Sequence, residues 1–294
     1  MSRGSKERRA KERTAAVERQ QRLRGRVLER WGPSAPQDRV ERAGYLAAHA
    51  ILEENGLTPA GVRDIGFNCA AFTNTTLEPQ LRESTYACAP GCAWCCMLEV
   101  SAWPAEVIQL ASFIESRREG EVSPLLAKVR ETVTLADSQR AAGRWPRVAC
   151  PLLAPDRTCS VHEARPSSCA AACSFDAARC KAYAEGISDK DKDRIAANLE
   201  LLAPSRMAAH VIMQRGGPPT DGAGGGIDLH AGLAVALERG AEAAAAAWIA
   251  GADVFQEARE RSRWRMEKLA AEMRARTAPA APRLVTLGRP PPKG

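Results

Sequence analysis

Four of the ten cysteines in the chain stand within nine residues, in the stretch Cys88-Ala-Pro-Gly-Cys92-Ala-Trp-Cys95-Cys96. The Pro-Gly pair between the first two predicts a tight loop. A thiolate is a soft ligand, so thiols at loop spacing are typical of a site for zinc, iron or an iron–sulfur cluster. A disulfide scaffold would need a secreted chain, and buried apolar cysteines would not crowd into one loop. We therefore interpret this stretch as a metal-binding loop.

A second group of thiols follows, and two predicted helices separate it from the first. Pro155-Asp156 predicts a turn, so Cys150 and Cys159 are expected on the two arms of a small hairpin. Cys69 lies upstream of both groups without a nearby thiol, and we expect it to bind no metal. The candidate metal ligands of the two groups are Cys88, Cys92, Cys95, Cys96, Cys150, Cys159, Cys169, Cys173 and Cys180.

These two groups resemble the cysteine cluster of the YkgJ-type family, which is described as carrying a zinc- or iron-chelating domain. The resemblance covers about residues 86–182 and rests on the C-x3-C-x2-C-C spacing, on Cys150-Pro-Leu, and on Cys159-Ser-Val-His-Glu-Ala-Arg-Pro-Ser-Ser-Cys169. His162 and Ala170 stand where the family tends to have tyrosine and arginine, and neither change removes a thiol. The resemblance implies an eighth ligand at Cys173 or Cys180, and that choice stays open.

The residues between the thiols support this resemblance. Arg165-Pro166 is expected to direct a short turn that brings Cys159 and Cys169 together, and the Arg165 guanidinium would neutralise thiolate charge. Adjacent Cys95 and Cys96 are expected to point apart, so that both would not complete one four-ligand set. Seven or eight thiols then imply two mononuclear sites, or one cluster with spare thiols. His162 is expected beside the ligands or at the surface.

Two enzymatic interpretations compete with a simple metal-binding module. Cys88, Cys92, Trp94 and Cys95 fit the C-x3-C-x-aromatic-C spacing of radical SAM enzymes, but that fold needs alternating strands and helices, and helices are predicted here. Flagellin lysine N-methylases are similar in their cysteine cluster, which suggests an iron–sulfur-dependent transferase of that kind. The sequence offers no convincing SAM-binding glycine loop and no obvious general base. Catalytic residues therefore stay unassigned, and whether the chain is an enzyme stays open.

The elements around the thiols are predicted to be mainly helical, because aromatic residues make up only 5% of the chain and alanine is abundant. We expect a mainly α fold: a small irregular cysteine-rich metal-binding core with little β structure, packed with helices and extended by helices at both ends. The exception is the stretch 67–77, which holds Cys69 and is expected to include a strand or an extended loop. Helices are expected at 38–55, from Pro59, at 104–118, 123–143, 189–202 and 204–214, and from the linker to 276 with breaks near Gly240 and Gly251.

Composition divides the chain into six parts. The predicted parts are a basic N-terminal arm (1–36), a helical lead-in (37–85), the cysteine-cluster domain with its flanking helices (86–215), a Gly/Pro linker (216–226), a C-terminal helical region (227–276) and a disordered tail (277–294). Up to Trp31 the arm holds eleven Lys and Arg and four acidic residues. The difference, +7, equals the net charge of the whole chain.

The charge and the hydropathy pattern bear on partners and compartment. The basic arm suggests weak nucleic-acid contact, but no aromatic interleaving accompanies it, so we favour a solvated helix. No signal peptide and no run of 18 apolar residues is visible, which predicts a cytoplasmic protein without membrane insertion. The sequence thus predicts a zinc or iron–sulfur protein, a structural or redox module with an unknown protein partner. An iron–sulfur-dependent methylase-like transferase and a zinc-dependent nucleic-acid-binding protein are the alternatives.

Overall fold

A computed structural model describes residues 39–83, 87–117, 119–172, 174, 176–187, 202–219 and 226–277. The predicted basic arm, all but the last residue of the predicted helix from Asp189 to Leu202, most of the linker and the tail lie outside these residues. The described part of the chain is mainly helical, with one two-stranded sheet and irregular segments around the cysteines. The predicted fold class is therefore confirmed.

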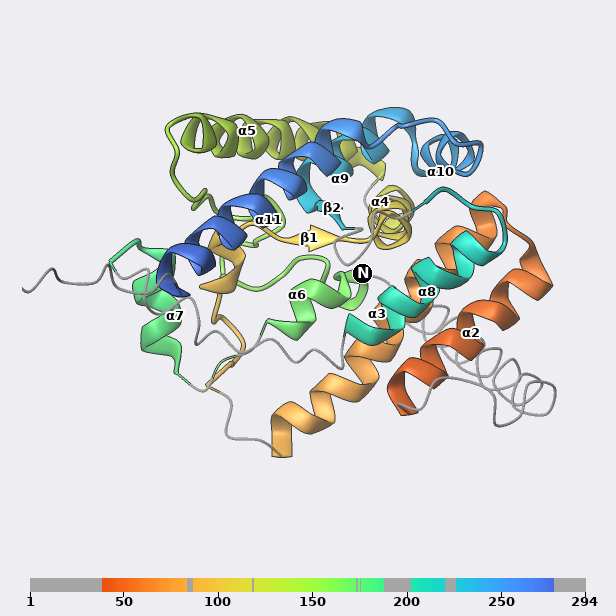
Figure 1. Cartoon of the computed structure of the whole chain (residues 1–294), viewed down its shortest axis with the longest axis horizontal. Helices are drawn as coiled ribbons and strands as arrows, with labels where there is room; N and C mark the ends of the chain where they lie inside the picture. The colour runs from red at the N-terminus through yellow and green to blue at the C-terminus, as the bar shows by residue number, and fades with distance from the viewer. Residues whose placement is uncertain are drawn as a thin grey trace, which may run out of the picture.

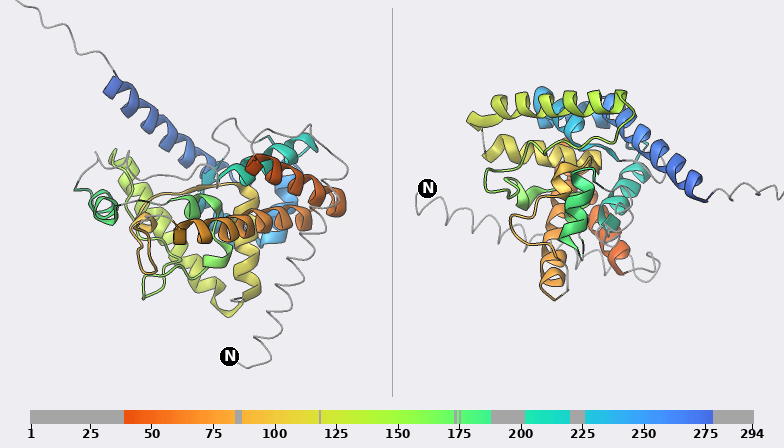
Figure 2. Two further views of the ribbon diagram at one scale, coloured as in Figure 1. Left: turned by 90° about the horizontal axis from the view of Figure 1, so that it is seen from below. Right: turned by 90° about the vertical axis from the view of Figure 1, so that its left-hand side faces the viewer.

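The helices form two groups on either side of α4, as Figure 1 shows. Helices α2, α3 and α8 pack together on one side, and α5, α9, α10 and α11 lie on the other, with α10 also reaching α3. Helix α11 projects from the rest of the molecule (Figure 2). The bounds are α2 Arg39–Asn55, α3 Pro59–Glu83, α4 Pro104–Arg117, α5 Val122–Ala141, α6 Ser167–Ala171, α7 Ala177–Ala184, α8 Ala203–Gln214, α9 Leu229–Arg239, α10 Ala241–Ile249, α11 Gln256–Thr277, β1 Ser101–Ala102 and β2 Ile227–Asp228.

Local sequence signals set the junction between α2 and α3. Gly56 takes a φ of +66° after the end of α2, which is the left-handed conformation that glycine adopts without a steric cost. The Thr58 hydroxyl accepts a hydrogen bond from the Gly61 N–H at 3.2 Å, and Pro59 occupies the first helical position. The predicted helix end and the predicted helix start are both confirmed.

Helix α3 is longer than the sequence suggested. The stretch 67–77, expected to include a strand or an extended loop, is helical throughout. Its threonines and asparagines are poor helix formers, but Ile65, Cys69, Ala70 and Thr73 are spaced to bury one helical face. The Thr73 hydroxyl donates to the Cys69 carbonyl at 2.8 Å, so it bonds within the helix rather than competing with it. Burial of this face overrides the local propensity.

Helix α4 is the central element of the core. Val107, Leu110, Ala111 and Ile114, which the sequence predicted as its apolar face, are fully buried. Gly66 of α3 lies so close to α4 that a Cβ there would come within 2.3 Å of the Ala105 carbonyl oxygen. Glycine at this position therefore sets the close approach of the two helices.

The small sheet joins the cysteine-bearing half of the chain to its C-terminal helices. Strands β1 and β2 pair antiparallel, with Ser101 opposite Asp228 and Ala102 opposite Ile227. The Leu229 N–H then donates to the Val100 carbonyl at 2.9 Å. This pairing places the start of α9 beside the segment that follows the first thiol group, and both strands lie at the centre of the molecule (Figure 1).

The breaks predicted in the C-terminal helical region are present at both glycines. Gly240 and Gly251 have φ values of +82° and +84°, and they separate α9, α10 and α11. One hydrophobic cluster runs from α2 through α4 to α11, with Cys150, Cys159 and Cys169 packed against it. The domain boundaries stay a prediction. None of the helices in the described ranges combines the length and the apolar character needed to cross a membrane.

Candidate metal centre

Backbone pairing brings the two thiol groups together. Cys95 and Cys96 lie in a single turn of 3-10 helix, η2 (Cys95–Met97), and Leu98 forms an antiparallel bridge with Arg147. The Cys150 N–H donates to the Cys96 carbonyl at 2.8 Å. The chain around Cys150 is therefore fixed next to the end of the first group.

The first loop has the tight turn that its Pro-Gly pair predicts. Gly91 takes a φ of +83°, and the Cys92 N–H donates to the Ala89 carbonyl at 2.9 Å. The Trp94 ring beyond it lies between two cations, with the Arg157 guanidinium carbon 4.5 Å and the Lys181 ammonium nitrogen 5.7 Å from its centroid. These contacts attach the first loop to the hairpin and to α7.

The predicted hairpin is present between Cys150 and Cys159. Leu153 and Cys159 form an antiparallel bridge, and the Ala154 N–H donates to the Thr158 carbonyl at 2.9 Å. At the turn, Asp156 Oδ1 accepts from the Thr158 N–H at 3.0 Å and from its hydroxyl at 2.7 Å. The aspartate thus stabilises the turn from within, as the Pro-Asp pair indicated.

Both hairpin thiols receive a backbone hydrogen bond from the residue two positions further on. The Leu152 N–H donates to the Cys150 sulfur, and the Val161 N–H donates to the Cys159 sulfur. Such bonds favour the ionised form of a thiol and therefore lower its pKa. A thiolate that binds a metal ion keeps these donors, which makes both positions suitable for metal ligands.

Arg165 is a cation that acts on three of the thiols. It lies between η4 (His162–Ala164) and α6, where Pro166 precedes the helix and the Cys169 N–H donates to the Pro166 carbonyl at 3.0 Å. The Arg165 charge opposes the rise in the pKa values of Cys95, Cys159 and Cys169. Its Nε is buried and has no hydrogen-bond partner within the described part of the chain. A buried cationic donor without an acceptor fits a neighbouring thiolate.

Four thiols from three segments influence one another. Burial raises the pKa of Cys169 well above its usual range, and Cys150, Cys159 and Cys95 add to the rise. Burial likewise raises the pKa of Cys150 to about 12, with Cys159 and Cys95 contributing. These thiols would stay protonated at neutral pH. A metal ion would supply the positive charge that lets them ionise.

The expectation that Cys95 and Cys96 point apart is wrong. The Cys96 side chain is the largest cause of the raised pKa of Cys95, so the two thiols lie close together. In a 3-10 helix successive side chains are about 120° apart, whereas they alternate by about 180° along an extended strand. The helical turn η2 therefore leaves the two neighbouring thiols within reach of each other.

A second subset gathers around the first loop. Burial raises the pKa of Cys180, and Cys92 and Cys95 add to the rise, which places Cys180 near both of them. The Ser174 N–H donates to the Cys88 sulfur at 3.4 Å, and the Ala87 N–H donates to the Ser174 carbonyl at 2.8 Å. Cys173, the other candidate for the eighth ligand, lies outside the described residues. The choice between Cys173 and Cys180 stays open.

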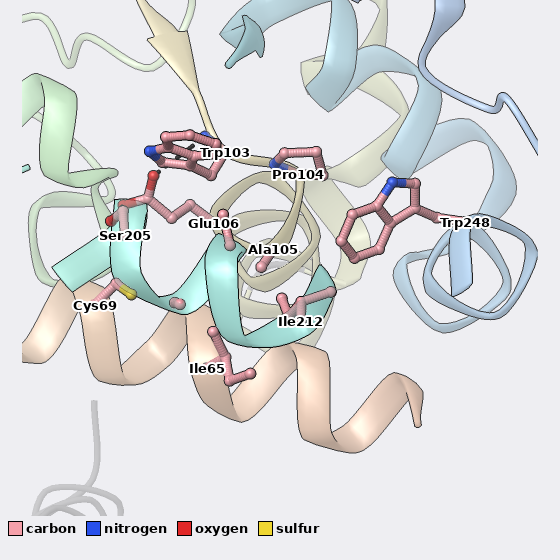
Figure 3. A pocket seen from close by; sticks show the side chains of 11 residues that line it. Ile65, Cys69, Trp103, Pro104, Ala105, Glu106, Ser205, Ile212 and Trp248 are labelled. Atoms are coloured by element: carbon pink, nitrogen blue, oxygen red, sulfur yellow. Dashed lines mark hydrogen bonds between the residues drawn. The ribbon is translucent and has the colours of Figure 1, made fainter. Parts of the chain in front are cut away.

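Cys69 lies apart from the thiol groups, as expected. It is fully buried in α3, and its sulfur neighbours Glu106 of α4 and Ser205 of α8. Figure 3 shows it at the edge of a small pocket between these helices. The cavity measures about 10 Å³, which is space for about one water molecule and too little for a substrate. Cys69 is therefore a packing residue.

Glu106 in the same region is a buried carboxylate with a full set of donors. Its Oε1 accepts from the Ser167 N–H at 2.7 Å and from the Ser205 hydroxyl at 2.9 Å, and its Oε2 accepts from the Trp103 N–H at 3.2 Å. These bonds compensate for its burial. Because Ser167 begins α6, Glu106 also fixes the helix that carries Cys169.

Two histidines lie near the cysteine segments. His162, placed by sequence beside the ligands or at the surface, is exposed in η4. His230 was missed: it lies at the start of α9, is 8% exposed, and its Nε2 is 3.4 Å from the Cys150 sulfur. Burial lowers the pKa of His230, so the ring is neutral at pH 7. The only signal in the sequence was its isolated position two residues after Asp228, far along the chain from Cys150.

The donor atoms are of the types that bind a soft metal ion, but the side chains are not positioned to coordinate one. Soft sulfur donors, backbone N–H groups directed at two of them, and the unpaired Arg165 Nε all suit a thiolate-bound ion. Across the described ranges, however, no three Cys, His, Asp or Glu side chains are arranged to hold an ion as they stand. The thiols are gathered, and side-chain rotation about the fixed backbone would have to complete the coordination.

The fold and the site define a class: a cysteine-rich chelating segment supported by a helical scaffold. Residues 87–193 match the family model CxxCxxCC, described as "Putative zinc- or iron-chelating domain". This match confirms the cysteine-cluster resemblance over the residues that carry both thiol groups. No curated protein and no solved structure matches the chain.

Proposed function

We propose that this chain is a cytoplasmic metal-binding protein that holds zinc or an iron–sulfur cluster through its two thiol groups and serves as a structural or redox module. The observation that carries the proposal is the mutual electrostatic influence of Cys95, Cys150, Cys159 and Cys169, which come from three separate segments. Placing several partly buried thiols near one another, with a cation beside them, has no packing advantage over apolar residues. Metal binding would explain why these thiols lie near one another.

The surroundings of the thiols favour a closed site over an open catalytic one. Cys150, Cys159 and Cys169 pack against the hydrophobic core, and the pKa values of all three are raised chiefly by burial. A metal ion held by four thiolates has no position free for a substrate, and its binding contributes directly to folding. No disulfide joins any of the nine cysteines among the described residues.

Anaerobic purification followed by metal and acid-labile sulfide analysis tests the proposal. Zinc without sulfide and a colourless protein support a structural site, whereas iron with equivalent sulfide and a brown colour support a redox module or an iron–sulfur enzyme. A preparation that contains neither metal, and that takes up neither zinc nor iron with sulfide on reconstitution under reducing conditions, would refute the proposal. The methylase-like transferase becomes relevant only with an iron–sulfur result. The nucleic-acid-binding alternative depends on the basic arm, and titration of the zinc protein with duplex DNA tests it.

A further inference from the structure

No sequence motif marks His230 as a functional residue. It is 80 residues from Cys150 along the chain and lies beyond the segment that matches the chelating-domain family. Its imidazole is nevertheless buried and touches one of the hairpin thiols. A buried histidine directed at a candidate ligand is a nitrogen donor at the edge of a sulfur site.

The separation of the two atoms fits shared coordination. His230 Nε2 and Cys150 Sγ are 3.4 Å apart. Two ligands of one tetrahedral zinc ion, at ordinary Zn–S and Zn–N bond lengths, are about 3.6 Å apart. A single ion could therefore bind both atoms with a shift of only a few tenths of an ångström in their separation. The same distance also fits an N–H to sulfur hydrogen bond, and cobalt(II) spectra distinguish the two.

The backbone around His230 is held firmly. Asp228 caps α9 by accepting from the Ala231 N–H at 2.8 Å, and its other carboxylate oxygen accepts from Arg140 Nη2 at 3.3 Å. Arg140 is also paired with Glu99, directly after the first thiol group. Together with the pairing of β1 and β2, these bonds fix the first turn of α9 against the cysteine segment. Such preorganisation is what a ligand from a distant element requires.

We propose that His230 is a nitrogen ligand of the ion that Cys150 binds, so that this ion has a mixed sulfur and nitrogen ligand set with Cys159 and Cys169. Cys95 influences Cys180 as well as the hairpin thiols, and in this division it belongs with Cys92 and Cys180 of the other subset. This division gives one site of four ligands and leaves three thiols for a second site, without requiring all the thiols to meet at one point. The inference rests on the proposed function and extends the site beyond the matched segment.

Cobalt(II) substitution of the full-length protein tests the assignment, because its ligand-field absorption bands distinguish sulfur from nitrogen ligands. In the His230→Cys variant, the bands should move to longer wavelength and the thiolate charge-transfer intensity should increase, with metal per chain unchanged. In His230→Ala, cobalt affinity should fall by more than about 100-fold, beyond the effect typical of a residue outside the coordination shell. His49→Gln is the matched control: His49 is also buried but is hydrogen-bonded to Arg215, and its variant should keep the wild-type bands.

The results separate this inference from the proposed function. If wild-type protein binds no cobalt, zinc or iron, the proposed function itself fails. If wild-type protein binds cobalt and both His230 variants keep the wild-type band positions, His230 is not a ligand. Long-range ¹H–¹⁵N spectra of zinc-loaded wild-type protein avoid any folding defect in the variants. One of the four histidines should show a metal-bound nitrogen, and spectra that are identical with and without zinc would overturn the assignment.

Discussion

The sharpest contrast in this protein is between Cys159 and Cys69, two cysteines with different expected roles. Cys159 lies on the hairpin among other thiols and accepts the Val161 N–H. Cys69 lies inside α3, between Glu106 and Ser205. Replacing each with serine makes the same small chemical change, sulfur to oxygen, in two environments. We expect Cys159→Ser to lower metal content and Cys69→Ser to leave it unchanged.

The magnitudes follow from what each thiol contacts. A structural zinc site contributes roughly 10–16 kcal/mol of apparent binding free energy, so weakening one of four ligands should cost roughly 3–5 kcal/mol of stability. For a chain of this size that is a fall in thermal midpoint of about 10 °C. At Cys69 the serine hydroxyl would have Ser205 as a hydrogen-bond partner, so the cost should be about 1 kcal/mol. The same contrast with Cys69 should hold for Cys92→Ser, Cys95→Ser and Cys169→Ser.

The assay is metal per chain for each purified variant, measured with its thermal midpoint. Circular dichroism confirms that each variant is folded before its metal content is interpreted. If Cys69→Ser empties the site while Cys159→Ser keeps a full complement of metal, the division into ligands and packing residue is refuted. Equal metal loss in both variants would show that packing of α3, rather than ligation, determines metal content.

Three further predictions concern the arm, the cation and pH. Deleting residues 1–31 should leave metal content and thermal midpoint unchanged, and loss of metal would show that the arm belongs to the domain; any nucleic-acid affinity of the arm should fall steeply with salt. Arg165→Met should weaken zinc binding by about 10- to 100-fold in competition titrations while Arg157→Met does not, and equal affinities would show that the charge facing the thiols is unimportant. Burial raises the folded-state pKa values of Cys150 and Cys169. Below the unfolded thiol pKa of about 8.5, the metal-free protein should therefore keep the stability that these two protonated thiols contribute. It should lose that stability as the pH rises through their folded-state pKa values, toward about 12 for Cys150. Urea midpoints from pH 7 to 10 with chelator and reductant measure this, and a midpoint that rises with pH would contradict it.

The parts of the fold that the sequence predicted well are those with local causes. The buried face of α4 follows from the spacing of Val107, Leu110 and Ile114, and the hairpin follows from Pro155-Asp156. The stretch 67–77 was misjudged because its threonines and asparagines disfavour a helix locally, while the burial of Cys69 and Thr73 depends on helices far along the chain.

The candidate site divides in the same way. The spacing of the cysteines along the chain is what made them candidate ligands, and that spacing is visible in the sequence. The contact between Cys95 and Cys96 depends on a single 3-10 turn that the residue types do not predict. The pairing of β1 with β2 helps to place His230 beside Cys150, and two-residue strands leave almost no periodic signal. Pairing between very short strands that lie far apart along the chain cannot be predicted from a single sequence.

The continuous hydrophobic cluster has a consequence for the order of events during folding. Its members extend from Leu46 to Ala258, and the thiols Cys150, Cys159 and Cys169 lie at its margin rather than at its centre. Helices and their mutual packing supply most of the buried surface, so they can assemble before any ion is present, unlike in a zinc finger that is unfolded without metal. Contacts between segments as distant as Cys150 and His230 are costly in loop entropy and should form late. The ion would then arrive at a nearly finished protein, and metal loading would be the last step of its maturation.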